Sequence, residues 1–137
     1  MFSSAQEYIT SIGENPWITD FAEKWVADKD CGGKDDAVRD MEFRISMLGD
    51  PDAKLISIIA VAARMPDGRH DDLLAAGMLE DFLVAHGEEY MTRIKGLAPL
   101  VPRFRSLLGG VCKRNIKKGV WHAIQAEADY PSRYGKE

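Results

Sequence analysis

Apolar side chains recur at three- and four-residue steps along most of this chain, the spacing that places them on one face of an α-helix. The first clear example follows Asn15-Pro16, where an N-cap residue and a proline precede an apolar stripe that ends at Cys31-Gly32-Gly33. This stripe contains Trp17, Phe21, Trp25 and Val26. Because no segment alternates apolar and polar residues as a half-buried strand does, the pattern predicts an all-α fold.

Two more helices follow in the same pattern. Asp35 is a suitable N-cap for a helix that ends at Gly49, and its apolar positions are Val38, Met41, Ile45 and Leu48. Asp50-Pro51 then starts a helix over residues 51–65 that is apolar on nearly all sides. A helix without a polar face belongs in the protein interior. We therefore expect residues 51–65 to form the central element of the core.

Turn and cap residues divide the next part of the chain into three shorter helices, which we place at residues 71–87, 88–98 and 102–110. Asp71 or Asp72 caps the first of them, and His86-Gly87 ends it. Gly77 lies in its middle, where glycine costs about 1 kcal/mol relative to alanine. We therefore expect Gly77 to let a neighbouring helix approach closely.

The connections between these helices are short, which makes successive helices pack antiparallel. We expect a single small domain, residues 1–137, of short antiparallel helical hairpins. Repeat-like stacking is a further option, although the sequence contains no exact repeat. A last helix passes through Ile116, Val120 and Ile124, whereas residues 129–137 are expected to fray.

Charge is distributed unevenly along the chain. Residues 100–137 contain eight Lys or Arg and three Asp or Glu, a net +5, so the first 99 residues carry −9 of the total charge of −4. The most conspicuous basic group is Lys113, Arg114, Lys117 and Lys118, which steps of four would align in a stripe on a helix. We expect this stripe to be a solvated helix face with Trp121 in the core. The alternative, given Trp121 and the tyrosines after it, is nucleic-acid binding through the basic helix.

The acidic counterpart surrounds the first interhelical loop, with Asp35, Asp36 and Asp40 as its central members. Acidic residues at helix N-termini act as caps and favourable charges. The alternative is a surface that binds a basic partner, for which opposite charge would raise the association rate.

Residues with catalytic or metal-binding spacing are scarce. His70, His86 and His122 share no metal-binding pattern, and Cys31 and Cys112 lack a paired-thiol motif. Phosphate-cradling, dinucleotide-binding and nucleophile-turn motifs are also absent. We therefore expect no cofactor, no metal and no enzyme activity. An unrecognised enzyme would draw on Cys112 with His122 or on the acidic pair Glu80 and Asp81.

One region has a distinctive sequence pattern. It contains the segment Leu74-Ala75-Ala76-Gly77-Met78-Leu79-Glu80-Asp81-Phe82-Leu83, then His86-Gly87, Arg93-Ile94 and Ala98, and then Pro102-Arg103-Phe104-Arg105 with Leu108-Gly109-Gly110-Val111. This pattern resembles a family of uncharacterised bacterial all-helical domains over residues 35–112, and the resemblance leaves 113–137 as a basic helix and tail. That family commonly has Pro in place of Met78 and Trp in place of Cys112. The resemblance implies a helical fold and a bacterial or phage origin, and it implies no activity.

These observations favour a non-enzymatic protein-binding module with a protein partner of unknown identity. In a bacterial or phage setting, such a module includes an immunity protein that blocks a toxin and an inhibitor of a defence complex. The N-terminus has no signal-like segment and no apolar run approaches the roughly 20 residues of a bilayer span. We therefore expect a soluble cytoplasmic protein without a membrane partner. The oligomeric state stays open, and nucleic-acid binding is the alternative function.

Overall fold

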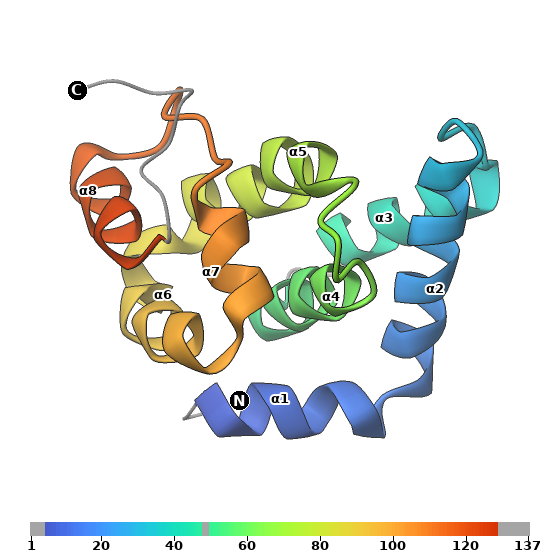
Figure 1. Ribbon diagram of the computed structural model, residues 1–137, viewed down its shortest axis with the longest axis horizontal. Coiled ribbons are helices and arrows are strands. Elements are labelled where there is room, and N and C mark those ends of the chain that lie inside the picture. The colour runs from blue at the N-terminus through green and yellow to red at the C-terminus, as the bar shows by residue number, and fades with distance from the viewer. Residues whose placement is uncertain (1–4, 48–49, 129–137) are drawn as a thin grey trace.

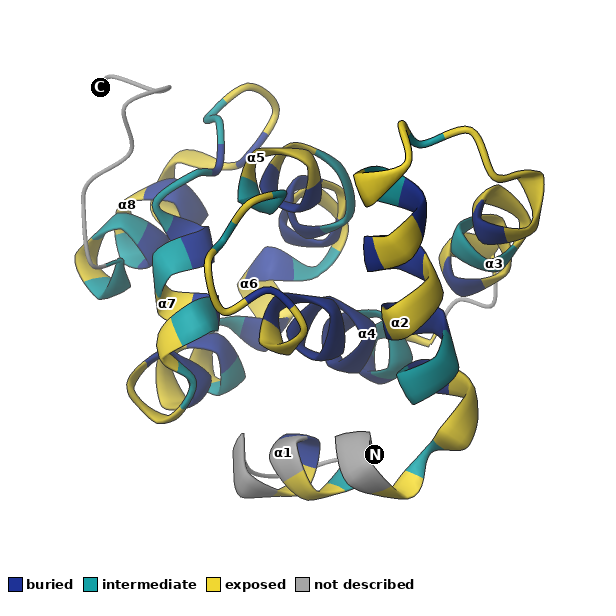
Figure 2. Ribbon diagram, turned by 45° about the vertical axis from the view of Figure 1, so that its right-hand side comes forward, coloured by how far each residue is buried: buried dark blue, intermediate teal, exposed yellow. Residues whose placement is uncertain are grey.

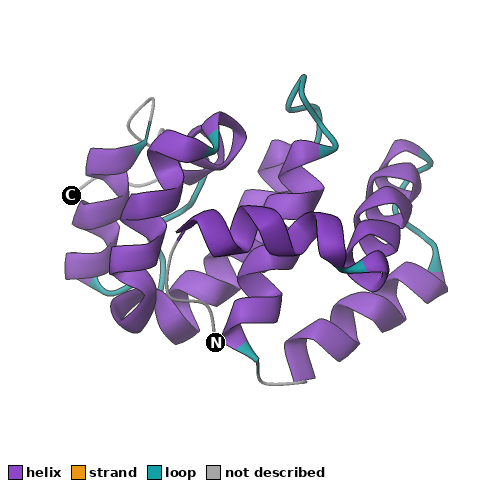
Figure 3. Cartoon of the chain, turned by 90° about the horizontal axis from the view of Figure 1, so that it is seen from below, coloured by secondary structure: helices purple, strands orange, loops and turns teal. Residues whose placement is uncertain are grey.

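The structure is a computed structural model that describes residues 5–47 and 50–128. Every regular element in this described part is helical (Figures 1 and 3), which confirms the all-α prediction. In chain order the elements are α1 (Ala5–Glu14), α2 (Pro16–Asp30), α3 (Asp36–Met47), α4 (Pro51–Ala63), α5 (Asp71–Leu74), the π-helix η1 (Ala75–Leu79), α6 (Glu80–Leu100), α7 (Pro102–Leu108) and α8 (Lys118–Glu127).

The N-terminal ends of α2, α3 and α4 have the caps that the sequence predicts. Asn15 Oδ1 accepts a hydrogen bond from the Trp17 N–H at 3.1 Å, and Asp35 Oδ1 accepts one from the Ala37 N–H at 2.9 Å. Asp50 caps α4 in the same way. These bonds satisfy N–H groups that the first turn of a helix leaves without a partner. Helix α1 precedes these elements and was not predicted.

Helix α4 is the centre of the fold, as expected from its apolar sequence. Residues 55–62 are all buried, and Figure 2 shows α4 as a buried helix surrounded by the others. It packs against α1, α2, α3, α5, η1, α6 and α7. Helices α1 and α6, far apart in sequence, also pack together. The described helices thus surround a hub, whereas a repeat-like stack would confine contacts to neighbouring repeats.

A buried carboxylate joins three of these helices. Asp52, in the first turn of α4, accepts hydrogen bonds from the hydroxyl of Tyr8 in α1 and from that of Tyr90 in α6, the latter at 3.0 Å. All three residues are buried. Burial, followed by the hydrogen bond to Asp52, raises the pKa of Tyr90 to about 12 and raises the pKa of Tyr8 as well. Both hydroxyls therefore stay protonated at neutral pH and act as donors.

Residues 71–100 form one helical stretch through α5, η1 and α6, so the predicted helix end at His86-Gly87 is wrong. Both residues lie inside α6. A Cβ built on Gly87 would lie 2.7 Å from Cγ1 of Val120 in α8, closer than real side chains approach. Gly87 therefore lets α8 pack directly onto the backbone of α6. The role expected of Gly77, close approach of a neighbouring helix, belongs to Gly87 instead.

The predicted last helix is present as α8, but its predicted basic stripe is wrong, because Lys113, Arg114 and Lys117 lie in the loop between α7 and α8. Helix α8 begins only at Lys118. Arg114 has a φ angle of 30°, in the left-handed region that interrupts a right-handed helix. Ile116 is buried and fixes the loop to the core. Stacking like charges at four-residue steps would in addition destabilise a helix here.

Candidate protein-binding groove

A groove of about 470 Å³ opens between α3 on one side and η1 and α6 on the other, over α4. We call this space the α3–α6 groove. It is lined by Glu42, Phe43, Ile45 and Ser46 from α3, Lys54 and Ile58 from α4, and Gly77, Met78, Asp81, Phe82, Ala85 and His86 from η1 and α6. The volume is in the range of sites that receive a ligand or a partner side chain.

The α3–α6 groove is apolar inside and has exposed apolar side chains at its margin. Ile45, Ile58 and Phe82 are buried, whereas Phe43 is 61% exposed. Met47, one turn further along α3, is 67% exposed. The main packing partners of α3 are α2 and α4, and among its described residues only Val38 and Ile45 are fully buried. Helix α3 thus presents apolar surface that the described part of the protein does not cover.

Two opposite charges that line this groove have no partner among the residues that the structure describes. In the described part of the chain, neither the Asp81 carboxylate nor the Lys54 ammonium group has a hydrogen bond or ion pair. The other acidic lining residue, Glu42, lies 3.4 Å from Lys29 Nζ. His86 is also engaged, because its Nδ1 lies 3.2 Å from Glu89 Oε1 and its ring packs on Phe82. Asp81 and Lys54 are therefore available to a bound partner.

The π-helix η1 forms part of the groove wall. A π-helix contains one more residue per hydrogen-bonded turn than an α-helix, and such turns occur often at functional sites. Gly77 lies in η1, and a Cβ built on it would have no atom within 4 Å. Gly77 has no positive φ angle either. Neither packing nor backbone conformation therefore requires glycine at this position, which the free protein leaves open to the groove.

The acidic residues singled out in the sequence are engaged in local structure. Asp35 caps α3, and its own N–H donates to the buried Asp28 carboxylate at 2.8 Å. Although burial opposes it, this bond together with Lys29 lowers the pKa of Asp28. Asp36 and Asp40 are exposed and pair within α3, with Arg39 at 3.4 Å and Arg44 at 2.9 Å. A partner-binding role for Asp35, Asp36 and Asp40 stays a prediction.

The basic residues do not form a helical stripe, and two of them are paired. Lys117 forms an ion pair with Glu88, and Arg114 Nη1 lies 3.9 Å from Glu80 Oε1. Glu80 is buried, and its other carboxylate oxygen has no hydrogen-bond partner. Lys113 is half-buried, while Lys118 is exposed at the start of α8. Nucleic-acid binding through these four residues stays a prediction with a changed geometry.

The uneven distribution of charge along the chain places acidic and basic segments at opposite ends of the molecule. In Figure 1, α2 and α3, which carry most of the acidic residues around the first interhelical loop, lie at one end of the molecule, and α8 with the basic loop before it lies at the other. The α3–α6 groove borders the acidic end through α3. A charged partner would therefore approach the two ends with different preference.

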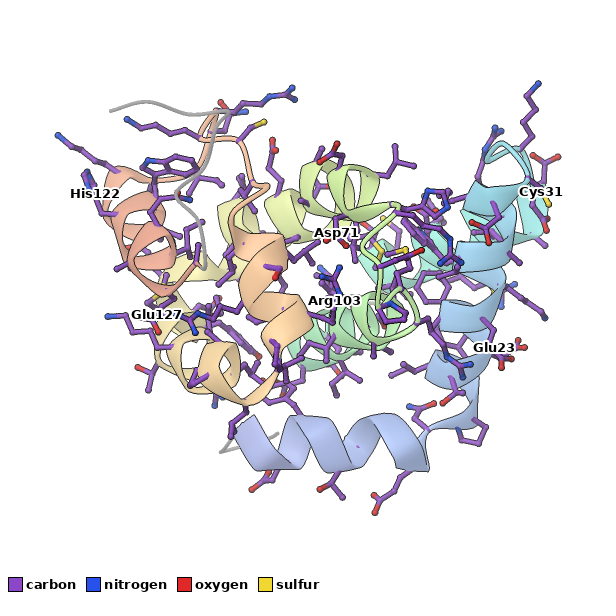
Figure 4. The ribbon with its side chains drawn as sticks, viewed as in Figure 1. Glu23, Cys31, Asp71, Arg103, His122 and Glu127 are labelled. Carbon is purple, nitrogen blue, oxygen red and sulfur yellow. The ribbon has the colours of Figure 1, made fainter. Side chains whose placement is uncertain are left out.

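Two further clusters have a structural explanation. Arg69 bonds to both carboxylate oxygens of Asp30, at 2.9 and 3.0 Å, and His70 Nε2 lies 2.6 Å from Asp30 Oδ1. Arg69 and then His70 lower the pKa of Asp30 below its usual range. Figure 4 shows Asp71 and Arg103 turned toward each other, and their closest N···O distance is 2.5 Å. These pairs connect the segment after α4 to α2 and α7.

Cys112 and His122, the pair considered for catalysis, lie on different segments of the chain. Cys31 is exposed just after α2, and Cys112 is half-buried in the loop before α8. His122 lies exposed on α8 (Figure 4). The residues that the structure describes contain no group of three His, Cys, Asp or Glu side chains that could hold a metal ion. Every helix in this described part is too short or too polar to cross a lipid bilayer.

Fold and surface define a small all-helical domain with a groove between helices. Residues 29–131 match the model of a family of unknown function, DUF6869, and the chain belongs to this family. The match extends beyond residues 35–112, where the resemblance was first seen, and includes every element that lines the α3–α6 groove. No curated protein and no solved structure matches the chain.

Sequence reasoning did not identify the groove residues as a site. Three segments contribute them, and the distances between those segments along the chain do not indicate that they are neighbours in space. Two signals were nevertheless present. Phe43 and Met47 are apolar but lie outside the buried stripe of α3, and Gly77 has an intrinsic cost in a helix.

Proposed function

We propose that this protein is a non-enzymatic protein-binding module and that the α3–α6 groove is its binding surface. The observation that carries the proposal is a groove with apolar residues inside, exposed apolar residues at its margin and two charges with which no described residue pairs. Protein interfaces combine an apolar centre with a polar rim in this way. The partner contributes the apolar surface that would cover Phe43 and Met47.

A helical segment is the partner structure that fits best. An amphipathic helix binds by laying its apolar face into a groove between helices, whereas an extended peptide adds to the edge of a sheet. The described residues, 5–47 and 50–128, contain no strand to which an extended peptide could add. The groove walls are themselves helices, which hold their side chains in fixed positions.

Two biological roles suit such a module: an immunity protein that blocks a toxin, and an inhibitor of a defence complex. In both roles one small domain must occupy a surface of a larger protein. The acidic end beside the groove would accelerate association with a basic partner. Identification of the captured partner distinguishes the two roles.

The test is affinity capture of the tagged protein from its native host, with and without nuclease, followed by mass spectrometry. Ala85→Trp would fill the groove from an exposed position, and Ala27→Trp on α2 is the matched control outside it. We expect one near-stoichiometric partner that survives nuclease, is lost with Ala85→Trp and is kept with Ala27→Trp. Equal capture by both variants would refute the groove as the binding surface.

Nucleic-acid binding through Lys113, Arg114, Lys117 and Lys118 predicts the opposite outcome of the same experiment. Recovery would then depend on nucleic acid and would be lost with nuclease treatment. Binding would weaken steeply with salt, and replacing Lys117 and Lys118 would reduce that salt dependence.

A further inference from the structure

We infer that the occupant of the α3–α6 groove is an amphipathic helix of a partner protein, with a basic residue opposite Asp81, an acidic residue opposite Lys54, and its backbone close to Gly77. This inference rests on the proposed function and names the chemistry of the partner. It makes Gly77 the residue that selects the partner by leaving room for it.

The charge pattern expected of the partner helix follows from Asp81 and Lys54, with which no described residue pairs. Asp81 is exposed on α6, which forms one wall of the groove, and Lys54 is half-buried on α4, over which the groove lies, so the two charges belong to different elements of its lining. Placing an apolar helix over them would remove water from both groups, and the cost of that desolvation is recovered only if each meets an opposite charge. A helix with one cation and one carboxylate beside its apolar stripe supplies both partners. The two charges would also fix the direction in which the helix lies.

Gly77 supplies the position of closest approach. Glycine inside a helix is unfavourable, and in the described part of the chain no neighbouring atom within 4 Å of a Cβ built on Gly77 accounts for it. Ten residues later Gly87 has such an explanation, because Val120 of α8 packs on its backbone. A partner helix lying on Gly77, as α8 lies on Gly87, would give the same residue type the same use.

The basic end of a second copy of this chain fits the groove poorly. This end has the charge to meet Asp81, yet Val111 and Ile116 in its loop are buried. That loop therefore offers no apolar side chain to fill the groove and no carboxylate positioned for Lys54. A separate partner with its own apolar stripe matches both requirements.

The test uses a displayed library of amphipathic helical peptides of random sequence, selected against the full-length protein. The inference predicts that the recovered peptides share an apolar stripe with one basic and one acidic flanking position. Selection against Asp81→Lys should change the conserved basic residue to an acidic one, and selection against Lys54→Glu should change the conserved acidic residue to a basic one.

The role of Gly77 is tested with the peptides that wild type selects. We expect Gly77→Leu to weaken their binding about tenfold or more, because a side chain would occupy the space of the peptide backbone. Gly77→Ala should weaken it less and should keep the thermal unfolding midpoint of wild type or raise it. Ala27→Trp, outside the groove, should bind as wild type does.

The possible failures separate the two proposals. Recovered helices without the two charges, or with binding that Gly77→Leu leaves unchanged, would overturn the inference while groove-dependent partner capture stands. Recovery of no helical peptide would also overturn it. Partner capture that survives Ala85→Trp would instead overturn the proposed function.

Discussion

The two sides of the long helical stretch η1–α6 differ in how completely the protein covers them. On the side that faces α8, Val120 packs against the backbone of Gly87, and Leu83 and Ile94 are fully buried. On the side that faces α3, Ala85 and Asp81 are exposed and Gly77 has no neighbour within 4 Å of a built Cβ. One side is a close-packed interior contact, and the other is a surface that the described part of the protein leaves uncovered.

This difference shows why residue type alone does not indicate a role. Gly77 and Gly87 have the same intrinsic cost in a helix, about 1 kcal/mol relative to alanine. At Gly87 close packing with α8 offsets that cost within the fold, whereas at Gly77 nothing in the described structure offsets it. A cost without a structural return is the expected mark of a position shaped by binding.

The largest effect on the covered side is expected at the buried carboxylate. Asp52→Ala removes the carboxylate that accepts hydrogen bonds from Tyr8 and Tyr90, and the loss of a buried acceptor costs about 1–3 kcal/mol for each donor. We expect the free energy of unfolding to fall by about 2–5 kcal/mol, measured by chemical denaturation. Asp81→Ala, on the open side, is the control and should change it by less than about 0.5 kcal/mol. Similar losses for both variants would contradict the comparison.

A smaller loss is expected where α8 meets α6. Gly87→Ala places a methyl group against Val120, and overpacking of this kind costs about 1–3 kcal/mol. Val120→Ala in the same protein should recover part of that loss, because it removes the methyl groups that clash. Thermal unfolding of the two single variants and the double variant measures the coupling. If the stability changes of the two single variants simply add in the double variant, the contact between residue 87 and Val120 does not cause the loss.

At Gly77 the expected change is smaller and has the opposite sign. Gly77→Ala should raise the free energy of unfolding by about 0.5–1 kcal/mol, because alanine favours the helix and meets no neighbour. The measurement is denaturant unfolding of the free protein. A clear loss of stability would mean that the fold itself requires Gly77. It would then contradict the interpretation of Gly77 as a binding position.

The smallest expected effect is a loss of stability that develops only at alkaline pH. Burial and the bond to Asp52 raise the pKa of Tyr90 to about 12, above the value of about 10 for an unfolded tyrosine. The folded state therefore holds its proton more tightly, so this contribution to stability is complete below about pH 10 and is lost as the pH rises toward 12. The free energy of unfolding, measured against pH, should decline less steeply in this window for Tyr90→Phe than for wild type. An unchanged slope would contradict the assignment.

The first half of the fold could be predicted because local chemistry determines it. Asn15 and Asp35 cap their helices, and Pro16 and Pro51 start theirs, through bonds between residues close in sequence. Helix α1 escaped prediction because its described anchoring contact, Tyr8 with Asp52, joins residues 44 positions apart. A local pattern does not contain that information.

The errors in the second half arise from tertiary contacts that override local signals. Gly87 has the residue type of a helix end, yet the approach of Val120 keeps it inside α6. Lys113 to Lys118 have helical spacing, yet burial of Ile116 and the backbone turn at Arg114 place most of them in a loop. The groove could not be predicted for the same reason, since it exists only where α3 and α6 stand apart over α4.

The most direct test of the account is chemical-shift mapping of the isotope-labelled protein with the helical segment of its captured partner. The account predicts that the largest shifts occur at Phe43, Gly77, Asp81 and Ala85, around the α3–α6 groove. Shifts confined to the loop from Lys113 to Lys117 and the start of α8 would contradict it and would assign binding to the basic end of the molecule.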